Sequence, residues 1–303
     1  MLYYSRRFFD ADGFGVLPPS AVESCTNFLL QLSRVASDLT VLEVTFNGHI
    51  PPIGAALSSA VSTKTNITAF TSAEVPLLPK GFVQLSRCPC LHTAIVSLRA
   101  DDWVTDGNTV SPQLDRDVCF PTLLTLTMSL NNFDLCVHPI QIIQSQELSD
   151  LTLEFAGHLD SDIPVCLATL PHRPFASCLR KLAIKLDAVI DPPSYTVRVG
   201  DLAPLFPLHL HHLMIYSHDI VANDNFVRKV SEAWPNIETL RLSTSKESAW
   251  QVSLPGLLPF ICHCPLLSEL CINADAATAA SVSYSGNEAW SRVAEPCPAP
   301  LER

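Results

Sequence analysis

The chain has 303 residues, a formal net charge of -11, 48% hydrophobic residues and only 16% charged residues. This apolar content can fill a core, so it excludes disorder as the main state of the chain. With 30 acidic against 19 basic residues, the composition also argues against binding to nucleic acid.

The N-terminal sequence, Met1 to Asp10, has neither the apolar core nor the cleavage site of a signal peptide. No stretch approaches about 18 uninterrupted apolar residues, so we expect no membrane span. These features predict a cytoplasmic or nuclear protein. In such a compartment the 11 cysteines are expected to be reduced and buried rather than disulfide-bonded.

A first helix is predicted from Ser20 to Ser37, with Phe28, Leu29, Leu32 and Val35 on one face. From Leu39 onward one block recurs: an apolar anchor, two residues, a second anchor, and then alternating apolar positions. The second anchors, spaced 24 to 32 residues apart, are Leu42, Phe70, Ala94, Leu126, Leu151, Leu182, Leu213, Leu240 and Leu270. Each block has the period of two that is typical of a strand.

Stretches between the blocks are predicted to be helices, for example Asn223 to Trp234 and Leu257 to Cys262. A strand and a helix of this size cannot bury both apolar faces alone, so neighbouring units have to stack. The short step also requires parallel strands with the helices on the outer side. We therefore predict an α/β fold, a leucine-rich-repeat solenoid with its strands on the concave face. A doubly wound α/β domain is the alternative, because it too alternates strands and helices.

Three regions are expected. Residues 1–19 form an N-terminal extension, 20–275 an irregular leucine-rich-repeat array, and 276–303 a weakly structured C-terminal tail. At the ninth position of the repeat motif, Asn47 and Asn131 fit a side chain that bonds turn backbone, and Asp187 and Asp275 could substitute.

Residues between the anchors should point out of the concave face, because strand side chains alternate. The predicted protein-binding residues are Glu43, Thr45, Thr127, Thr152, Glu154, Lys181, Lys185, His212, Met214, Tyr216, Arg241, Glu269 and Asn273. Tyr216 and Arg241 are the first candidates for anchors of an interface. The alternative is a solvated face, on which Asp150 and Glu154 pair with Lys181 and Lys185.

Cysteine and histidine clusters were weighed as metal sites. Cys88-Pro89-Cys90 and Cys262-His263-Cys264 have one residue between the thiols, where zinc sites use two to four, so core cysteines are favoured. In a strand, His211 and His212 would face opposite sides. Phosphate-binding glycine loops and a Gly-x-Ser-x-Gly motif are missing from the sequence. We expect no metal, no cofactor and no enzymatic activity.

Two segments carry the clearest repeat signature, Ala233–Leu242 and Cys264–Ile272, with weaker copies at Cys88–Leu91 and Phe120–Leu123. They resemble the repeats of fungal F-box/leucine-rich-repeat proteins, and the resemblance covers most of residues 20–275. It implies a substrate-recognition subunit of an SCF-type ubiquitin ligase, whose F-box binds a Skp1-type adaptor and whose repeats bind the target protein. Leu17-Pro18-Pro19 matches the start of an F-box, but Ser24–Asp38 lacks its tail. A non-enzymatic scaffold with no link to ubiquitin is the alternative.

Overall fold

The computed structural model of the chain describes residues 18–36, 38–45, 50–105, 108–109, 119–131, 134–156, 163–187, 196–217, 219–244 and 250–274. These residues form an α/β fold around a nine-stranded sheet. Its strands are β1 (Val41–Glu43), β2 (Ala69–Pro76), β3 (Thr93–Leu98), β6 (Thr125–Leu130), β7 (Asp150–Ala156), β8 (Lys181–Asp187), β10 (His212–Ser217), β13 (Thr239–Thr244) and β15 (Glu269–Cys271). They lie side by side in chain order, and each neighbouring pair is parallel.

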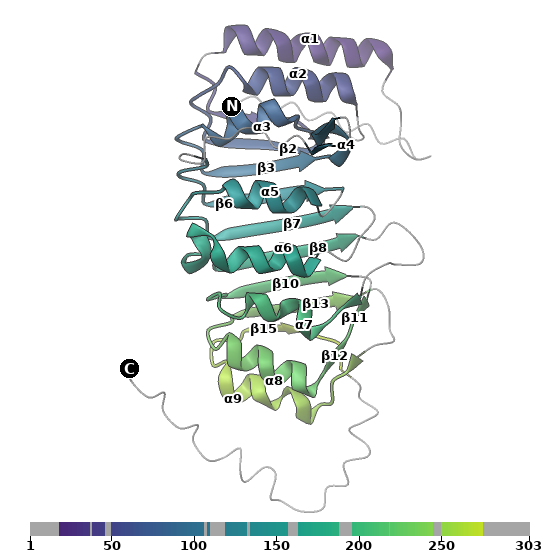
Figure 1. Cartoon of the computed structure of the whole chain (residues 1–303), viewed down its shortest axis with the longest axis vertical. Helices are drawn as coiled ribbons and strands as arrows, with labels where there is room; N and C mark the ends of the chain where they lie inside the picture. The colour runs from purple at the N-terminus through teal and green to yellow at the C-terminus, as the bar shows by residue number, and fades with distance from the viewer. Residues whose placement is uncertain are drawn as a thin grey trace, which may run out of the picture.

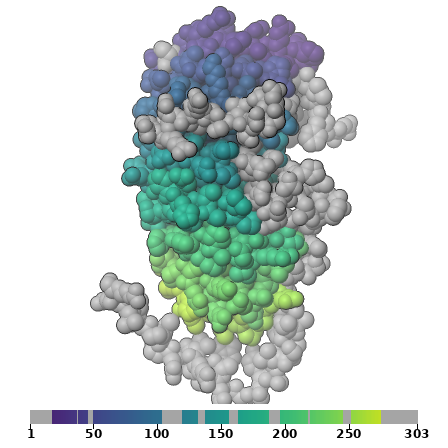
Figure 2. All heavy atoms as spheres, in the orientation of Figure 1, coloured from purple at the N-terminus to yellow at the C-terminus, as the bar shows by residue number. Residues whose placement is uncertain are grey.

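Helices connect successive strands, because a parallel neighbour can be reached only by a crossover. The α-helices are α1 (Pro19–Val35), α2 (Pro51–Val61), α3 (Pro79–Ser86), α4 (Ala100–Trp103), α5 (Asp134–Ile142), α6 (Ile163–Thr169), α7 (Val199–Leu202), α8 (Asp224–Ala233) and α9 (Leu258–His263). The 3-10 turns are η1 (Leu170–His172), η2 (Pro174–Ser177), η3 (Ala203–Leu205) and η4 (Pro255–Leu257). The longer helices lie on one face of the sheet (Figure 1), and the chain advances steadily along the longest axis of the molecule (Figure 2).

Short strand pairs accompany the main sheet. They are β4 (Val104–Thr105) with β5 (Asn108–Thr109), β9 (Thr196–Val197) with β11 (Asp219–Ile220), and β12 (Ala222–Asn223) with β14 (Trp250–Gln251). Within the described ranges, no helix is long and apolar enough to cross a membrane.

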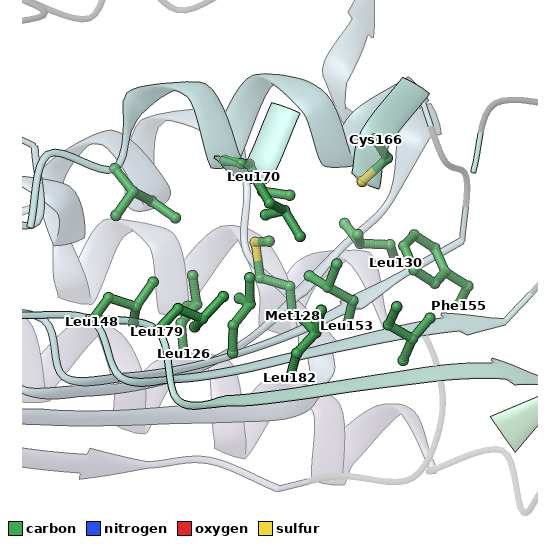
Figure 3. Packing of buried hydrophobic residues seen from close by; sticks show 14 of the residues in the cluster. Leu126, Met128, Leu130, Leu148, Leu153, Phe155, Cys166, Leu170, Leu179 and Leu182 are labelled. Carbon is green, nitrogen blue, oxygen red and sulfur yellow. The ribbon is translucent and has the colours of Figure 1, made fainter. Parts of the chain in front are cut away.

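The core lies between the sheet and its helices. On β3, β6 and β10 every second residue is buried and the residues between are half-buried. Figure 3 shows how the buried set packs: Leu126, Met128 and Leu153 point from the sheet toward Cys166 of α6 and Leu170 of η1. The alternation that predicted strands is therefore also the alternation between core and surface.

The predicted inward direction of the anchors is confirmed for eight of the nine second anchors, from Leu42 to Leu240, all of which are buried. Leu270 is in register with Leu240 and so lies on the same face of the sheet, but it is 37% exposed. Leu270 lies on β15, the last described strand. No described unit follows β15 to cover its outer side, so the side chain keeps contact with water.

The predicted helices agree with the structure to within two residues at each end. In α8, Phe226, Val227 and Val230 are buried as predicted, and the Asn223 side chain caps the helix by accepting the Phe226 N–H at 3.0 Å. In α1 only part of the predicted apolar face is covered: Leu29 is buried, but Phe28 and Val35 are exposed. This helix is the first described element, and among the described residues it packs mainly against α2.

Backbone carbonyls at the amino ends of the strands form what we call the carbonyl ladder. Each carbonyl accepts N–H groups from two consecutive residues of the next unit, at N···O distances of 2.7–3.3 Å. The ladder residues are Thr40, Thr68, His92, Leu124, Ser149, Arg180, His211 and Glu238. The same backbone geometry thus recurs once per strand, even though the side chains at these positions have nothing in common.

One predicted turn contact is confirmed: the Asn131 side chain accepts the backbone N–H of Ala100, from the preceding unit, at 2.7 Å. Asn47, Asp275, the side chain of Asp187 and the predicted C-terminal tail lie outside the described residues. So does the predicted N-terminal extension, except for its last two residues. Pro18 precedes α1, and Pro19 is its first residue.

Candidate binding surface

The face of the sheet opposite the helices carries the half-buried strand positions, and we call it the open face. Parallel register aligns these positions into rows that run across the strands. From β6 to β13 the rows are Thr125, Asp150, Lys181, His212 and Thr239; Thr127, Thr152, Ala183, Met214 and Arg241; and Ser129, Glu154, Lys185, Tyr216 and Ser243.

Eleven of the predicted binding residues lie on strands of this face. They are Glu43, Thr127, Thr152, Glu154, Lys181, Lys185, His212, Met214, Tyr216, Arg241 and Glu269, and all are half-buried. Thr45 and Asn273 lie just beyond the carboxyl ends of β1 and β15. The structure therefore gathers the predicted residues on one side of the sheet.

Ion pairs connect neighbouring strands of the open face. Lys181 Nζ lies 2.7 Å from Asp150 Oδ2, and Lys185 Nζ lies 2.6 Å from Glu154 Oε1. These contacts confirm the pairing across the sheet that the sequence suggested. The Ser129 hydroxyl also donates to Glu154 Oε2 at 2.9 Å. Exposed pairs of this kind contribute only about 0–1 kcal/mol each, so they are no obstacle to a partner that competes for the same groups.

Arg241 connects two other predicted residues. Its guanidinium forms an ion pair with the Glu269 carboxylate on β15 and also contacts the Tyr216 phenol on β10. The hydrogen bond that the guanidinium donates to Glu269, and then the one with Tyr216, raise the pKa of Arg241 above its ordinary value. Arg241 is therefore held in place as a permanent cation with its planar group oriented by two neighbours.

Ala183 is an open-face residue that the sequence reasoning passed over. It occupies the middle of β8 but is only 2% exposed, because it lies between Lys181 and Lys185 along the strand and between Thr152 and Met214 across it. A small residue between two lysines at alternate positions was the available sequence signal. Ala183 is thus a short, buried side chain among longer ones.

The open face changes character along the sheet. On β2, β3 and β6 its side chains are uncharged and mostly hydroxyl-bearing: Ala69, Thr71, Thr93, Ile95, Ser97, Thr125, Thr127 and Ser129. On β7 to β15 it carries the ion pairs described above. A partner crossing both parts would meet two different chemistries.

Two histidines meet Glu238 at the amino ends of β10 and β13. His211 Nδ1 lies 2.9 Å from Glu238 Oε1, and His212 Nε2 lies 3.9 Å from Oε2. The expectation that the two histidines face opposite sides is therefore wrong. His211 precedes β10 and lies in the turn, so strand alternation does not apply to it. The hydrogen bond with His211 lowers the pKa of Glu238.

Each of the two cysteine pairs has one buried and one exposed member. Cys88 and Cys264 are buried as predicted, and their thiols donate to carbonyls of the preceding unit, Lys64 O at 3.5 Å and Trp234 O at 3.6 Å. Burial raises the pKa of each thiol to about 11. Cys90 and Cys262 are exposed, which corrects the prediction for these two, because each lies on the outer side of its turn or helix. The described residues contain no group of three or more ligands suited to a metal.

Ser231 and His263 form the closest arrangement to a nucleophile and its base, with 3.1 Å between Ser231 Oγ and His263 Nδ1. Ser231, however, is fully buried and donates its hydroxyl proton to the Arg228 carbonyl at 2.8 Å. A serine that gives its proton to the backbone cannot give it to histidine at the same time. The contact holds α8 and α9 together.

No protein-family model matches the chain, and no curated protein matches it. The open face is therefore interpreted from its own residues and geometry.

Proposed function

We propose that the chain is a leucine-rich-repeat-type solenoid that binds another protein on its open face. One observation carries this proposal: nine parallel strands in unbroken chain order align mostly polar side chains into rows on the face of the sheet that no described helix covers. Parallel sheets of ordinary α/β domains are covered by helices on both faces and read as continuous apolar runs. Stacked repeats, by contrast, expose such a face and use it for binding.

The doubly wound alternative is not favoured by the strand order. In a doubly wound sheet the order reverses at a switch point, where the ligand binds. The described strands have no such reversal, and the carbonyl ladder repeats from the first unit to the last. Both features support a stack of equivalent units.

A photo-cross-linker tests the binding function. We would place p-benzoylphenylalanine at Met214 on the open face and, as a matched control, at Lys229 on α8, in cells that express the whole chain. A discrete cross-linked protein at Met214, absent at Lys229 and lost when Arg241 is changed to Ala, is the expected result. Equal labelling at both positions, or none at Met214, would overturn the proposal.

The narrower role, a substrate-recognition subunit of an SCF-type ubiquitin ligase, is supported by the resemblance of Ala233–Leu242 and Cys264–Ile272 to F-box/leucine-rich-repeat proteins. It requires binding to a Skp1-type adaptor. Mixing the purified chain with a recombinant adaptor and measuring co-elution tests this role separately. If no complex forms, the chain is better described as a scaffold without a ubiquitin link.

A further inference from the structure

Building on the proposed function, we propose that the partner segment bound across β8, β10 and β13 is acidic. Its carboxylates would be held by Lys181, Lys185 and Arg241, and an apolar side chain between them would rest on Met214. This names the chemistry of the partner, which the binding proposal alone leaves open.

The first support is the distribution of charge. We call nine open-face positions of β8, β10 and β13 the basic band: Lys181, Ala183, Lys185, His212, Met214, Tyr216, Thr239, Arg241 and Ser243. These nine positions hold three basic side chains and no carboxylate. Asp187, the last residue of β8 and two positions beyond Lys185, has its side chain outside the described residues and is not counted in the band. The acids that pair with them lie outside it, with Asp150 and Glu154 on β7 and Glu269 on β15.

The second support is the exposure of the charged groups. Lys181 is 39% exposed and its partner Asp150 only 25%, and Lys185 is 44% exposed and Glu154 only 32%. Arg241 and Glu269 are equally exposed, at 42% each. All three basic side chains are thus open to a partner, whose carboxylates can take the place of Asp150 and Glu154 at small cost.

The third support is the set of side chains that a partner can reach between the charged groups. Ala183 is covered by its neighbours at 2% exposure, but Met214, directly beside it on β10, is half-buried and accessible. Met adapts to varied apolar partners, and Tyr and Arg are the residues that most often anchor interfaces. From β8 to β13 the band spans about 10 Å, enough for two carboxylates of one extended segment.

The overall charge of -11 does not oppose this assignment at close range. At physiological ionic strength, charges more than about 8 Å apart are largely screened. A bound carboxylate therefore senses the ammonium and guanidinium groups next to it more strongly than distant acids.

Selection from a random 12-residue peptide library displayed on phage, with the whole chain as bait, tests the inference. Recovered peptides enriched in Asp and Glu, whose binding is lost in Lys181→Gln/Lys185→Gln, are the expected result. Peptides that depend on Met214 or Arg241 but lack acidic enrichment would overturn the acidic partner and leave the binding function standing. If no peptide depends on the open face, both proposals fail.

Synthetic versions of the recovered peptides then allow a quantitative test by fluorescence anisotropy. Lys181→Gln/Lys185→Gln should weaken binding by about 10-fold, and added salt should weaken binding to the wild type. Glu154→Gln releases Lys185 from its internal partner, so it should tighten binding by about 3-fold. The control Lys229→Gln, on the helical side, should change nothing. Unchanged or weaker binding in Glu154→Gln, with circular dichroism like that of the wild type, would contradict the exchange of carboxylates.

Discussion

Cys88 and Cys264 occupy equivalent places in two distant units, and Phe120 and Trp234 occupy the same place in two others. Each of the four is buried and is followed by proline in the turn before a strand. The residue types differ, but all four fill the space beneath the turn. In this position the thiol packs in the core and contacts a backbone carbonyl. The Cys-x-Cys spacing therefore arises from packing, and the described residues contain no metal-ligand cluster around it.

The buried thiols predict a loss of stability in alkali. Their pKa is raised from 9.0 to about 11, so the folded state keeps them neutral at a pH where unfolded thiols ionise. This contribution is complete below pH 9 and is lost as the pH rises toward about 11. Urea unfolding at pH 8 and pH 10.5 should give a smaller pH dependence of the free energy of unfolding in Cys88→Ala/Cys264→Ala than in the wild type.

Other groups also titrate in this range, so the comparison needs a control at an exposed cysteine. Cys271→Ala, at an exposed cysteine on β15, should keep the full pH dependence of the wild type. A double variant whose dependence equals that of Cys271→Ala would show that the buried thiols do not supply the effect.

Among the elements, α1 depends on a contact that sequence periodicity does not reveal. Lys64, only 3% exposed in the turn after α2, donates from Nζ to the carbonyls of Ser33 at 3.1 Å and Ala36 at 2.5 Å. These carbonyls belong to the C-terminal end of α1, where the helix leaves acceptors without partners and favours a positive charge. A buried lysine thus joins the first helix to the second.

Lys64→Met keeps most of the side-chain stem and removes the charge and its hydrogen bonds. We expect it to destabilise the docking of α1 by about 2 kcal/mol, because hydrogen bonds from charged groups are among the stronger ones. Amide hydrogen exchange should accelerate in α1 and stay unchanged in β7 and β8. Lys80→Met, at an exposed position of α3, is the control, and equal exchange in α1 for both variants would refute the role of Lys64.

Some features of the strands and helices could be predicted from the sequence, and others could not. Alternating anchors predicted eight strands of the main sheet, their parallel direction and their buried sides, and also the marginal block at Phe70, because all of these follow from local periodicity. The exposure of Phe28 and Leu270, and the position of His211 in a turn, depend on which unit lies next to them and on where each strand begins. Such facts are set by neighbours in space, so periodicity within one block cannot supply them.

The open face, too, has features that the sequence predicts and features that it does not. Strand alternation was enough to place the predicted residues on one face and to pair Lys181 with Asp150 and Lys185 with Glu154. The burial of Ala183 depends on the relative register of three strands. The contacts of Arg241 with Tyr216 and Glu269 depend on register in the same way. Spacings that vary from 24 to 32 residues leave that register open until the strands are aligned.

At the scale of the whole molecule, each described strand of the main sheet pairs only with its neighbours in chain order, so the effect of a substitution should depend on its place in the sheet. Leu182 is fully buried between β7 and β10, whereas Leu270 occupies the equivalent position at the end. Leu182→Asp should cost on the order of 4 kcal/mol or more, since it removes a core side chain and buries an unpaired charge. Leu270→Asp should cost only about 1 kcal/mol. Thermal unfolding followed by circular dichroism measures both, and equal losses would refute the inward direction of Leu182.

The strict chain order of the sheet has a mechanical consequence. No described strand pairs with one distant in the sequence, so the strands and the helices between them are connected in series. A force applied to the two ends of the array would open the outermost unit first and leave the next one intact. Each opened unit of 24 to 32 residues would release roughly 80 to 110 Å of extended chain. The sheet should therefore lengthen in steps under load, with its middle strands, such as β7, among the last parts to open.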